Sequence, residues 1–329
     1  MTKQITAVLD LDWVKYTAAG AGEKRSIVVT HKPSGRVKDF ANRTEFHGRD
    51  KKKSGGWLGE VNAKRDSPFT LDEFEIEDVQ TTEPIENVLH TAKSMVEGAL
   101  ERLGTKKQIG YVGIGDSFRV ERSTILRYKD GRDKALKPVH LPAVEEYIVH
   151  KFKANVVTGL EADDWVVIEA FGKDDHVVVA VDKDAKSQPV KVFNPDHPDQ
   201  GIIDCNQFGK LWLDDKGEVR GYGEMFLGFQ IAYGDDVDVF KAHSASDVSW
   251  GKKTAYKALQ DVTEPSQLWP KVIEVYKHLY PEPKIIKGWR GDDIEIDWKY
   301  VMEENFVMAR MLTSKNDPTM LDDYLRGKV

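Results

Sequence analysis

Apolar and polar residues follow two different periods along this chain. Continuous apolar runs, which are typical of strands buried on both faces, occur at residues 5–14 (ITAVLDLDWV), 108–115 and 177–181. Apolar residues recur at helical spacing over 84–103, and Gly104 follows as a stop signal, so this segment predicts an amphipathic helix of the core.

Shorter segments continue the same alternation. Two β-rich runs around a Pro-Ser-Gly turn predict a hairpin over 24–41, and LWLDDKGEV predicts another over 211–219. Residues 142–152 predict a helix, and residues 190–194 and 201–206 predict short strands. Strands that alternate with helices favour an α/β fold with a wound, largely parallel sheet.

The pattern changes near residue 222. Residues 1–222 make up the predicted α/β core, and residues 223–329 a predicted C-terminal region made only of helices. Within the core, the insertion at 42–66 is basic and contains glycine, with RDKKKSGGW at its centre. It predicts a mobile loop that is either solvated or in contact with a polyanion.

Two acidic clusters, GLEADD and VDKD, lie close together in the sequence. Their acids are Glu161, Asp163 and Asp164 in the first cluster, and Asp182 and Asp184 in the second. The first cluster opens a helix-like run and the second follows an apolar strand, whose carboxyl end is where α/β sheets build their sites. Two carboxylates ~4 Å apart repel by about 4 kcal/mol at an effective dielectric of about 20, and Mg²⁺ relieves this repulsion. The alternative is a solvated helix cap beside a charged turn.

Further acids extend this predicted site. Asp10 and Asp116 end apolar strands, and Asp235 and Asp238 lie in GDDVD. Carboxylates without histidine or cysteine ligands favour Mg²⁺ or Mn²⁺ over zinc. Two such ions can activate water and stabilise the leaving oxygen of a phosphodiester.

The net charge of −7 argues, taken alone, against a nucleic-acid partner. Nine carboxylates are assigned to the metal site, however, so −7 plus 9 leaves +2 for the rest, and bound cations would dominate the local field. No apolar stretch approaches the ~20 residues of a membrane span, and the start MTKQITAVLD lacks the features of a signal peptide. Cys205 is the only cysteine, so a cytoplasmic location without disulfides is expected.

Six motifs in a fixed order carry a family resemblance. The series VLD, GDSFR, YKDGR, GLEADD, VDKD and GDxxD resembles the structure-specific 5′ nucleases, which include flap endonucleases. AVLDLDW, the long segment before GDS, and SWGKKTA most resemble the phage 5′-to-3′ exonucleases of the T7 type. The resemblance runs from residue 7 to residue 259. It implies a PIN-like core and, for a phage-encoded protein, the host cytoplasm.

The resemblance also implies roles for single residues. It implies a first metal group of Asp10, Asp116, Glu161 and Asp163, then Asp164 between the groups, and a second group of Asp182, Asp184, Asp235 and Asp238. Tyr128, Lys129 and Arg132 match residues at the gateway for the displaced 5′ strand. There a cation can hold the scissile phosphate and an aromatic ring can stack on a base. An exposed charged turn is the alternative for YKDGR. Arg119 is either a DNA contact or a structural ion-pair partner.

The segment GKKTAYKAL resembles the end of the family's helix-three-turn-helix, which binds duplex DNA by its backbone. Lys252, Lys253 and Thr254 open a helix there, and helix N-termini attract phosphates. VFKAHSASDVSW replaces the usual glycine-rich turns, so the motif is degenerate. The gateway segment at 133–142 is also short.

The expected function is that of a Mg²⁺-dependent 5′-to-3′ exonuclease with flap endonuclease activity, in which Mn²⁺ substitutes for Mg²⁺. Its expected partners are DNA 5′ ends, flaps and RNA primers, and no membrane. One alternative is a haloacid-dehalogenase-like phosphatase, with Asp10 as nucleophile and Asp12 as acid/base, which leaves YKDGR and EADD without a role. The other is a catalytically silent DNA-binding protein on a nuclease scaffold.

Overall fold

The computed structural model describes residues 4–49, 55–132 and 135–329. The chain divides into two compact units: unit 1 comprises Met1–Val14, Ser94–Leu136 and Tyr147–Val329, and unit 2 comprises Lys15–Lys93 and Lys137–Glu146. This division does not fall at residue 222, because the central sheet and the C-terminal helices share unit 1.

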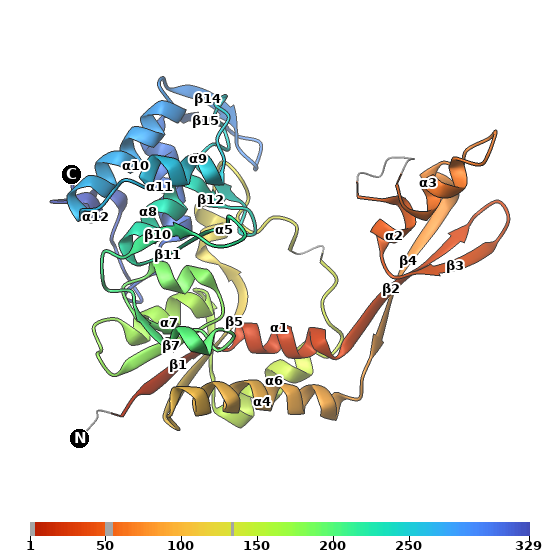
Figure 1. The fold of residues 1–329 in the computed structure, drawn as a ribbon, viewed down its shortest axis with the longest axis horizontal. Helices are drawn as coiled ribbons and strands as arrows, with labels where there is room; N and C mark the ends of the chain where they lie inside the picture. Colours follow the sequence, from red (N-terminus) through yellow and green to blue (C-terminus); the bar gives the residue numbers. More distant parts are fainter. Residues whose placement is uncertain (1–3, 50–54, 133–134) are drawn as a thin grey trace. The chain divides into compact units, whose positions relative to one another are not determined.

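Unit 1 is built on a six-stranded sheet with the order β6-β5-β1-β7-β8-β9, of which β1, β5 and β7 are labelled in Figure 1. The strands are β1 (Thr6–Asp10), β5 (Gln108–Ser117), β6 (Asn155–Gly159), β7 (His176–Val179), β8 (Lys191–Phe193) and β9 (Ile202–Asp204). Neighbours from β6 to β8 pair in parallel, and β9 pairs antiparallel to β8. This confirms the predicted α/β class with a largely parallel sheet.

The buried strand β1 organises this sheet. All five of its residues are buried, as the continuous apolar run predicts, and helix α7 (Ala162–Ala170) packs against β1, β5 and β7. The strand ends at Asp10 rather than at the predicted residue 14, because helix α1 (Asp12–Ala21) begins two residues later. Short helices follow β5 and β7, namely α5 (Phe118–Arg122) and the 3₁₀ turn η3 (Lys183–Ser187).

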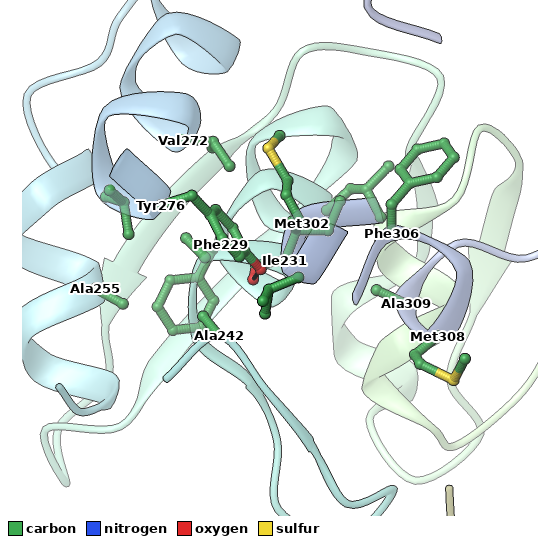
Figure 2. Packing of buried hydrophobic residues seen from close by; sticks show 14 of the residues in the cluster. Phe229, Ile231, Ala242, Ala255, Val272, Tyr276, Met302, Phe306, Met308 and Ala309 are labelled. Atoms are coloured by element: carbon green, nitrogen blue, oxygen red, sulfur yellow. Dashed lines mark hydrogen bonds between the residues drawn. The ribbon is translucent and has the colours of Figure 1, made fainter. Parts of the chain in front are cut away.

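The C-terminal part of unit 1 packs helices around a large apolar core, in which Tyr276, Met302 and Phe306 lie together (Figure 2). The helices are α8 (Gly223–Tyr233), α9 (Lys252–Leu259), α10 (Pro265–Leu279), α11 (Trp298–Ala309) and α12 (Leu321–Leu325). The prediction of a purely helical region is wrong, because two short strand pairs lie between these helices: β12 (Gly234–Asp235) with β13 (Phe240–Lys241), and β14 (Lys284–Lys287) with β15 (Asp293–Ile296). The predicted hairpin before them is confirmed as β10 (Lys210–Leu213) and β11 (Val219–Tyr222).

Unit 2 contains a three-stranded antiparallel sheet with the order β3-β2-β4 (Figure 1). Strands β2 (Glu23–His31) and β3 (Arg36–Phe40) form the predicted hairpin, and β4 (Phe74–Thr82) adds a strand that the pattern did not predict. The predicted helices at 84–103 and 142–152 are α4 (Ile85–Leu103) and α6 (Leu141–Phe152), each of which begins in unit 2 and ends in unit 1.

The insertion at 42–66 is not the predicted loop over its described length. It contains helices α2 (Arg43–His47) and α3 (Gly56–Asn62), and Phe40, Phe46 and Phe74 form an aromatic core with Trp57 packed against it. Asn42 caps α2 by accepting the backbone N–H of Glu45 at 2.9 Å. The central lysines Lys51, Lys52 and Lys53 lie outside the described residues.

Across the described ranges, no helix combines the length and the apolar character that a bilayer crossing requires.

Candidate active site

Asp10 and Asp12 fix the carboxyl end of β1 to the neighbouring strand. The backbone N–H of Asp12 donates to the Asp10 carboxylate at 2.9 Å, and the N–H of Gly113 on β5 donates to the Asp12 carboxylate at 3.0 Å. A Cβ atom on Gly113 would lie 3.0 Å from Asp12 Oδ2, so the close approach of the first turn of α1 to β5 favours glycine here. Asp12 thus serves as a strand connector, which speaks against the acid/base role that a phosphatase requires of it.

Asp10, Asp163 and Asp182 form a cluster of mutually repelling carboxylates at this edge of the sheet. Burial raises the pKa of Asp10 to about 7, and the charges of Asp12 and Asp182 contribute to the same shift. Burial and the charge of Asp10 also raise the pKa of Asp163 well above its usual range, and the two side chains share a hydrogen bond. The cluster therefore favours a proton or a cation that compensates its charge.

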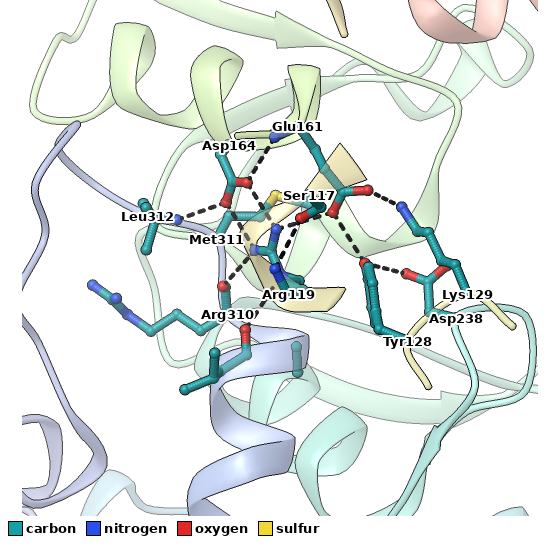
Figure 3. A network of polar contacts seen from close by, with 12 residues as sticks. Ser117, Arg119, Tyr128, Lys129, Glu161, Asp164, Asp238, Arg310, Met311 and Leu312 are labelled. Atoms are coloured by element: carbon teal, nitrogen blue, oxygen red, sulfur yellow. Dashed lines mark hydrogen bonds and ion pairs between the residues drawn. The ribbon is translucent and has the colours of Figure 1, made fainter. Parts of the chain in front are cut away.

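Glu161 contacts the predicted gateway residues Tyr128 and Lys129 (Figure 3), and its charge also acts on Asp163 of the acidic cluster. It is the N-cap of α7, where Glu161 and Asp164 form a capping box. Its carboxylate accepts from the Tyr128 hydroxyl at 3.0 Å and pairs with the Lys129 ammonium. Although burial lowers the pKa of Lys129, the charges of Glu161 and Asp238 raise it above its usual value, so the side chain is held as a cation.

Asp238 completes this network from the turn between β12 and β13. Its carboxylate accepts from the Tyr128 hydroxyl at 3.0 Å and from Arg132 at 2.7 Å, and its carbonyl accepts the backbone N–H of Lys129 at 2.9 Å. Lys129 has a φ of 56° and the next residue after Asp238, Val239, a φ of 61°. Both values lie in the left-handed region, which is unfavourable for a β-branched residue such as valine.

The gateway residues differ in their exposure. Tyr128 is 3% exposed, so its ring does not offer a face to a nucleobase in this conformation. The Arg132 side chain is 50% exposed and faces solvent beside Asp238. Tyr128 therefore has a structural role through its contacts with Glu161 and Asp238, whereas Arg132 is accessible to a phosphate.

Arg119 and Asp164 form a buried ion pair, which favours the structural alternative for Arg119. The guanidinium donates twice to Asp164, at 2.7 and 2.8 Å, and also to Glu161 and to the Arg310 carbonyl. Asp164 additionally accepts the backbone N–H groups of Glu161 and Leu312. Because protein donors occupy both carboxylate oxygens, Asp164 is an anchor of the fold, and its assignment to the metal site stays a prediction.

A second carboxylate group surrounds Lys183. The Lys183 ammonium contacts Asp184 at 2.8 Å and Asp235 at 2.6 Å, and the Gln230 amide on α8 donates to Asp184. Burial and the charge of Asp182 raise the pKa of Asp184 to about 7. Sequence reasoning missed Lys183 and Gln230. Lys183 is part of the VDKD motif, which could have drawn attention to it. Gln230 is the one polar residue in the apolar helical run MFLGFQIA, and this isolated position is the signal that could have identified Gln230.

Asp116 and the residues that open α9 lie apart from these networks. Asp116 is exposed near the end of β5, where the pairing with β6 is irregular, and it makes no contact with the acidic cluster in the part of the chain that the structure describes. Lys252 pairs with Glu218 at 2.7 Å, and Lys253 and Thr254 are exposed in the first turn of α9. Their metal and DNA assignments stay predictions.

The residues that meet at this edge suit a divalent cation by their chemistry. Asp10, Asp163 and Asp182 are carboxylates whose charged forms disfavour one another, and Mg²⁺ or Mn²⁺ prefers such oxygen donors. As the described side chains stand, no group of three or more acids, histidines or cysteines could hold an ion. Lys129 and Lys183 occupy the oxygens of Glu161, Asp184 and Asp235, and a cation would have to take over these contacts.

Comparison with solved structures finds similarity to proteins of bacteriophage T5. The T5 D15 protein co-crystallised with metal ions matches with a TM-score of 0.44 and 13% identity, over 92% of this chain and 88% of that one. A mutant of the T5 5′-exonuclease matches with a TM-score of 0.38 and 15% identity, over 67% and 80% of the two chains. A T5 D15 flap endonuclease variant in a pseudo-enzyme-product complex with DNA and metal ions has the same TM-score and coverage at 16% identity.

No family model and no curated protein matches the sequence. Two of the three solved structures above are described as a 5′-exonuclease and as a flap endonuclease.

Proposed function

We propose that this chain is a divalent-metal-dependent nuclease that hydrolyses phosphodiesters at DNA 5′ ends, as a 5′-to-3′ exonuclease with flap endonuclease activity. One observation carries the proposal: the carboxylates of Asp10, Asp163 and Asp182 gather beside Glu161, whose partner is the cation Lys129. An acidic cluster flanked by cationic side chains suits a phosphodiester better than it suits a neutral substrate.

The metal ligands would come from two groups of carboxylates. The first group is Asp10, Asp116, Glu161 and Asp163, and the second is Asp182, Asp184, Asp235 and Asp238. The charge of Asp182 acts on Asp10, Asp163 and Asp184 alike, which supports a position of Asp182 close to both groups. Asp164 is the residue that the family resemblance puts between the groups. When bound, the ions supply an activated water and stabilise the leaving oxygen.

The cationic side chains of the chain itself bind and orient the substrate. Lys129 holds its charge because Glu161 and Asp238 lie beside it, and a DNA phosphate would replace part of this carboxylate environment. Arg132, half-exposed and paired with Asp238 at 2.7 Å, offers a second contact to the same strand. Lys253 and Thr254 at the exposed start of α9 would bind the duplex backbone.

The test is cleavage of a 5′-flap DNA carrying different labels at its two ends, in Mg²⁺, in Mn²⁺ and in EDTA. We expect metal-dependent release of nucleotides or short oligonucleotides from the 5′ side. A generic phosphomonoester serves as the parallel substrate. Turnover of the phosphomonoester with intact DNA would favour the phosphatase alternative, and DNA binding without any hydrolysis would favour the silent scaffold.

A further inference from the structure

A cavity of about 790 Å³ opens beside the second carboxylate group. Its walls come from the β8–β9 edge of the sheet, from the 3₁₀ turn η4 (Pro198–Gln200) and from the β10–β11 hairpin. The volume falls in the range of roughly 300–1,000 Å³ that is typical of pockets for small organic ligands. Lys183 lines the cavity and also contacts Asp184 and Asp235, so the cavity wall and the second carboxylate group share one residue.

Two lysines in the lining have charges that no carboxylate compensates. The Lys186 ammonium donates to the Gln200 side-chain oxygen at 3.0 Å, and the Lys210 ammonium lies 5.6 Å from the centre of the Trp212 ring. Neither lysine makes an ion pair within the described ranges of the chain. The lining acids are otherwise engaged, since Asp214 pairs with Arg220 at 2.8 Å and Asp204 accepts from Asn206. The cavity therefore favours an anionic ligand.

An aromatic surface lies next to one of these cations, Lys210, in the same cavity. Trp212 on β10 is 39% exposed, and its ring meets that of Tyr222 edge to face at 6.5 Å. A tight approach at the base of the hairpin supports this geometry, because a Cβ atom on Gly209 would lie 1.9 Å from the Tyr222 carbonyl oxygen. A partly exposed indole beside ammonium groups is the combination that binds a nucleobase and its phosphate.

We propose that this cavity binds one nucleotide of a single-stranded nucleic acid, with the base against Trp212 and the phosphate at Lys186 and Lys210. The choice of a strand over a free nucleotide rests on the proposed function, because Lys183 in the cavity wall also contacts two carboxylates of the candidate site. A subsite of this kind would hold the strand at a second point, away from the gateway residues Lys129 and Arg132.

The test measures the affinity of a 3′-labelled hexathymidylate by fluorescence anisotropy in EDTA, where no cleavage occurs. Replacing Trp212 by alanine should weaken binding by roughly tenfold, the scale of one lost base-stacking contact, and Trp212→Phe should restore most of it. Lys186→Ala should weaken binding by about threefold and reduce the slope of log affinity against log salt. Lys284→Ala is the matched lysine control, since Lys284 lies on the distant β14 strand and should leave affinity unchanged.

The possible outcomes separate this inference from the proposed function. An inactive enzyme whose oligonucleotide affinity still depends on Trp212 and Lys186 would overturn the nuclease proposal and support the subsite. An active nuclease in which Trp212→Ala and Lys186→Ala keep full affinity, with unchanged thermal midpoints, would overturn the subsite alone. Equal affinity for thymidine monophosphate and for the hexamer would overturn the assignment to a strand.

Discussion

Asp163 is the single residue that tests the predicted metal site most directly. It lies in the first turn of α7, shares a hydrogen bond with Asp10, and is surrounded by the charges of Asp10, Glu161 and Asp182. The isosteric change Asp163→Asn keeps the shape and removes one charge. We expect cleavage in saturating Mg²⁺ to fall by at least ~10²-fold, the scale of losing one major electrostatic stabiliser. The thermal midpoint should stay or rise, because repulsion is relieved.

The matched control is Asp174→Asn, because the Asp174 side chain is 91% exposed and makes only a long contact with Lys191. This variant should keep wild-type cleavage and stability. Near-normal activity of Asp163→Asn under the same conditions would refute its assignment as a metal ligand.

Lys129 tests the other half of the site. Its ammonium pairs with Glu161 and should meet the scissile phosphate mainly as charge develops in the transition state. We predict that Lys129→Ala lowers the single-turnover rate by on the order of 10²-fold, and DNA affinity measured in Ca²⁺ by much less. Lys173→Ala, which removes a comparable lysine–glutamate pair at the other end of α7, is the control. An equal fall in rate and affinity would reduce Lys129 to a backbone contact.

The position of some site residues could be predicted from the sequence, and the contacts of others could not. Asp10 was predictable because a continuous apolar run must end at a sheet edge, and its acid then lies with those of neighbouring strands. The burial of Tyr128 was not predictable, because it depends on Asp238, which lies 110 residues away along the chain. Likewise, no local pattern reveals that Asp164 is saturated by Arg119 and by the Leu312 N–H.

At the scale of elements, the Arg119–Asp164 pair ties α5, α7 and the end of α11 together. Both side chains are almost fully buried, at 2% and 0% exposed. Removing one partner leaves the other charge buried without compensation, which typically lowers the free energy of unfolding by about 3–5 kcal/mol. Asp164→Asn should therefore lower the free energy of unfolding in urea by about that amount, whereas Arg326→Ala, at an 80% exposed side chain, should change it little. A near-neutral Asp164→Asn would contradict the anchor role.

Strand β12 and the turn that follows it contain Asp235 and Asp238, which test the role of the second carboxylate group. Asp235 accepts the backbone N–H groups of Val237 and Asp238 and contacts Lys183. The double change Asp235→Asn plus Asp238→Asn preserves these acceptors but removes two charges, so it should raise the Mg²⁺ concentration needed for cleavage. The loss should be smaller than for Asp163→Asn, and Mn²⁺ should partly rescue it. Rate measured against each metal decides the matter, and an unaltered Mg²⁺ dependence would make GDDVD a structural turn only.

The insertion at 42–66 shows why charge alone mispredicted an element. Its lysines and glycines favour a loop, yet Phe46 and Trp57 are spaced so that α2 and α3 bury them against Phe40 and Phe74. Four aromatic rings from four segments stabilise these short helices, and a local pattern cannot register contacts that form only after β4 joins the sheet.

At the scale of the whole molecule, acid should destabilise the chain through Asp317. Burial raises the pKa of Asp317, but hydrogen bonds from Thr319 and Thr313 and the Arg310 guanidinium outweigh it and hold the pKa below its usual value. The stabilisation is therefore complete above the unfolded carboxyl pKa of about 3.9 and is lost as the pH falls below it. Asp317→Asn should flatten the pH dependence of the thermal midpoint in this acidic window, and an unchanged profile would contradict the assignment.

The bond from Arg119 to the Arg310 carbonyl also has a consequence for the timing of synthesis. It joins residues 191 positions apart, so the acceptor is synthesised long after the arginine. A growing chain already contains every predicted metal ligand once Asp238 has been made, but its buried arginine still lacks this partner. We expect a chain ending at residue 309 to cleave DNA poorly, and addition of residues 310–329 to restore cleavage. In this order, synthesis of the predicted metal ligands would precede synthesis of the carbonyl that completes the contacts of the buried arginine.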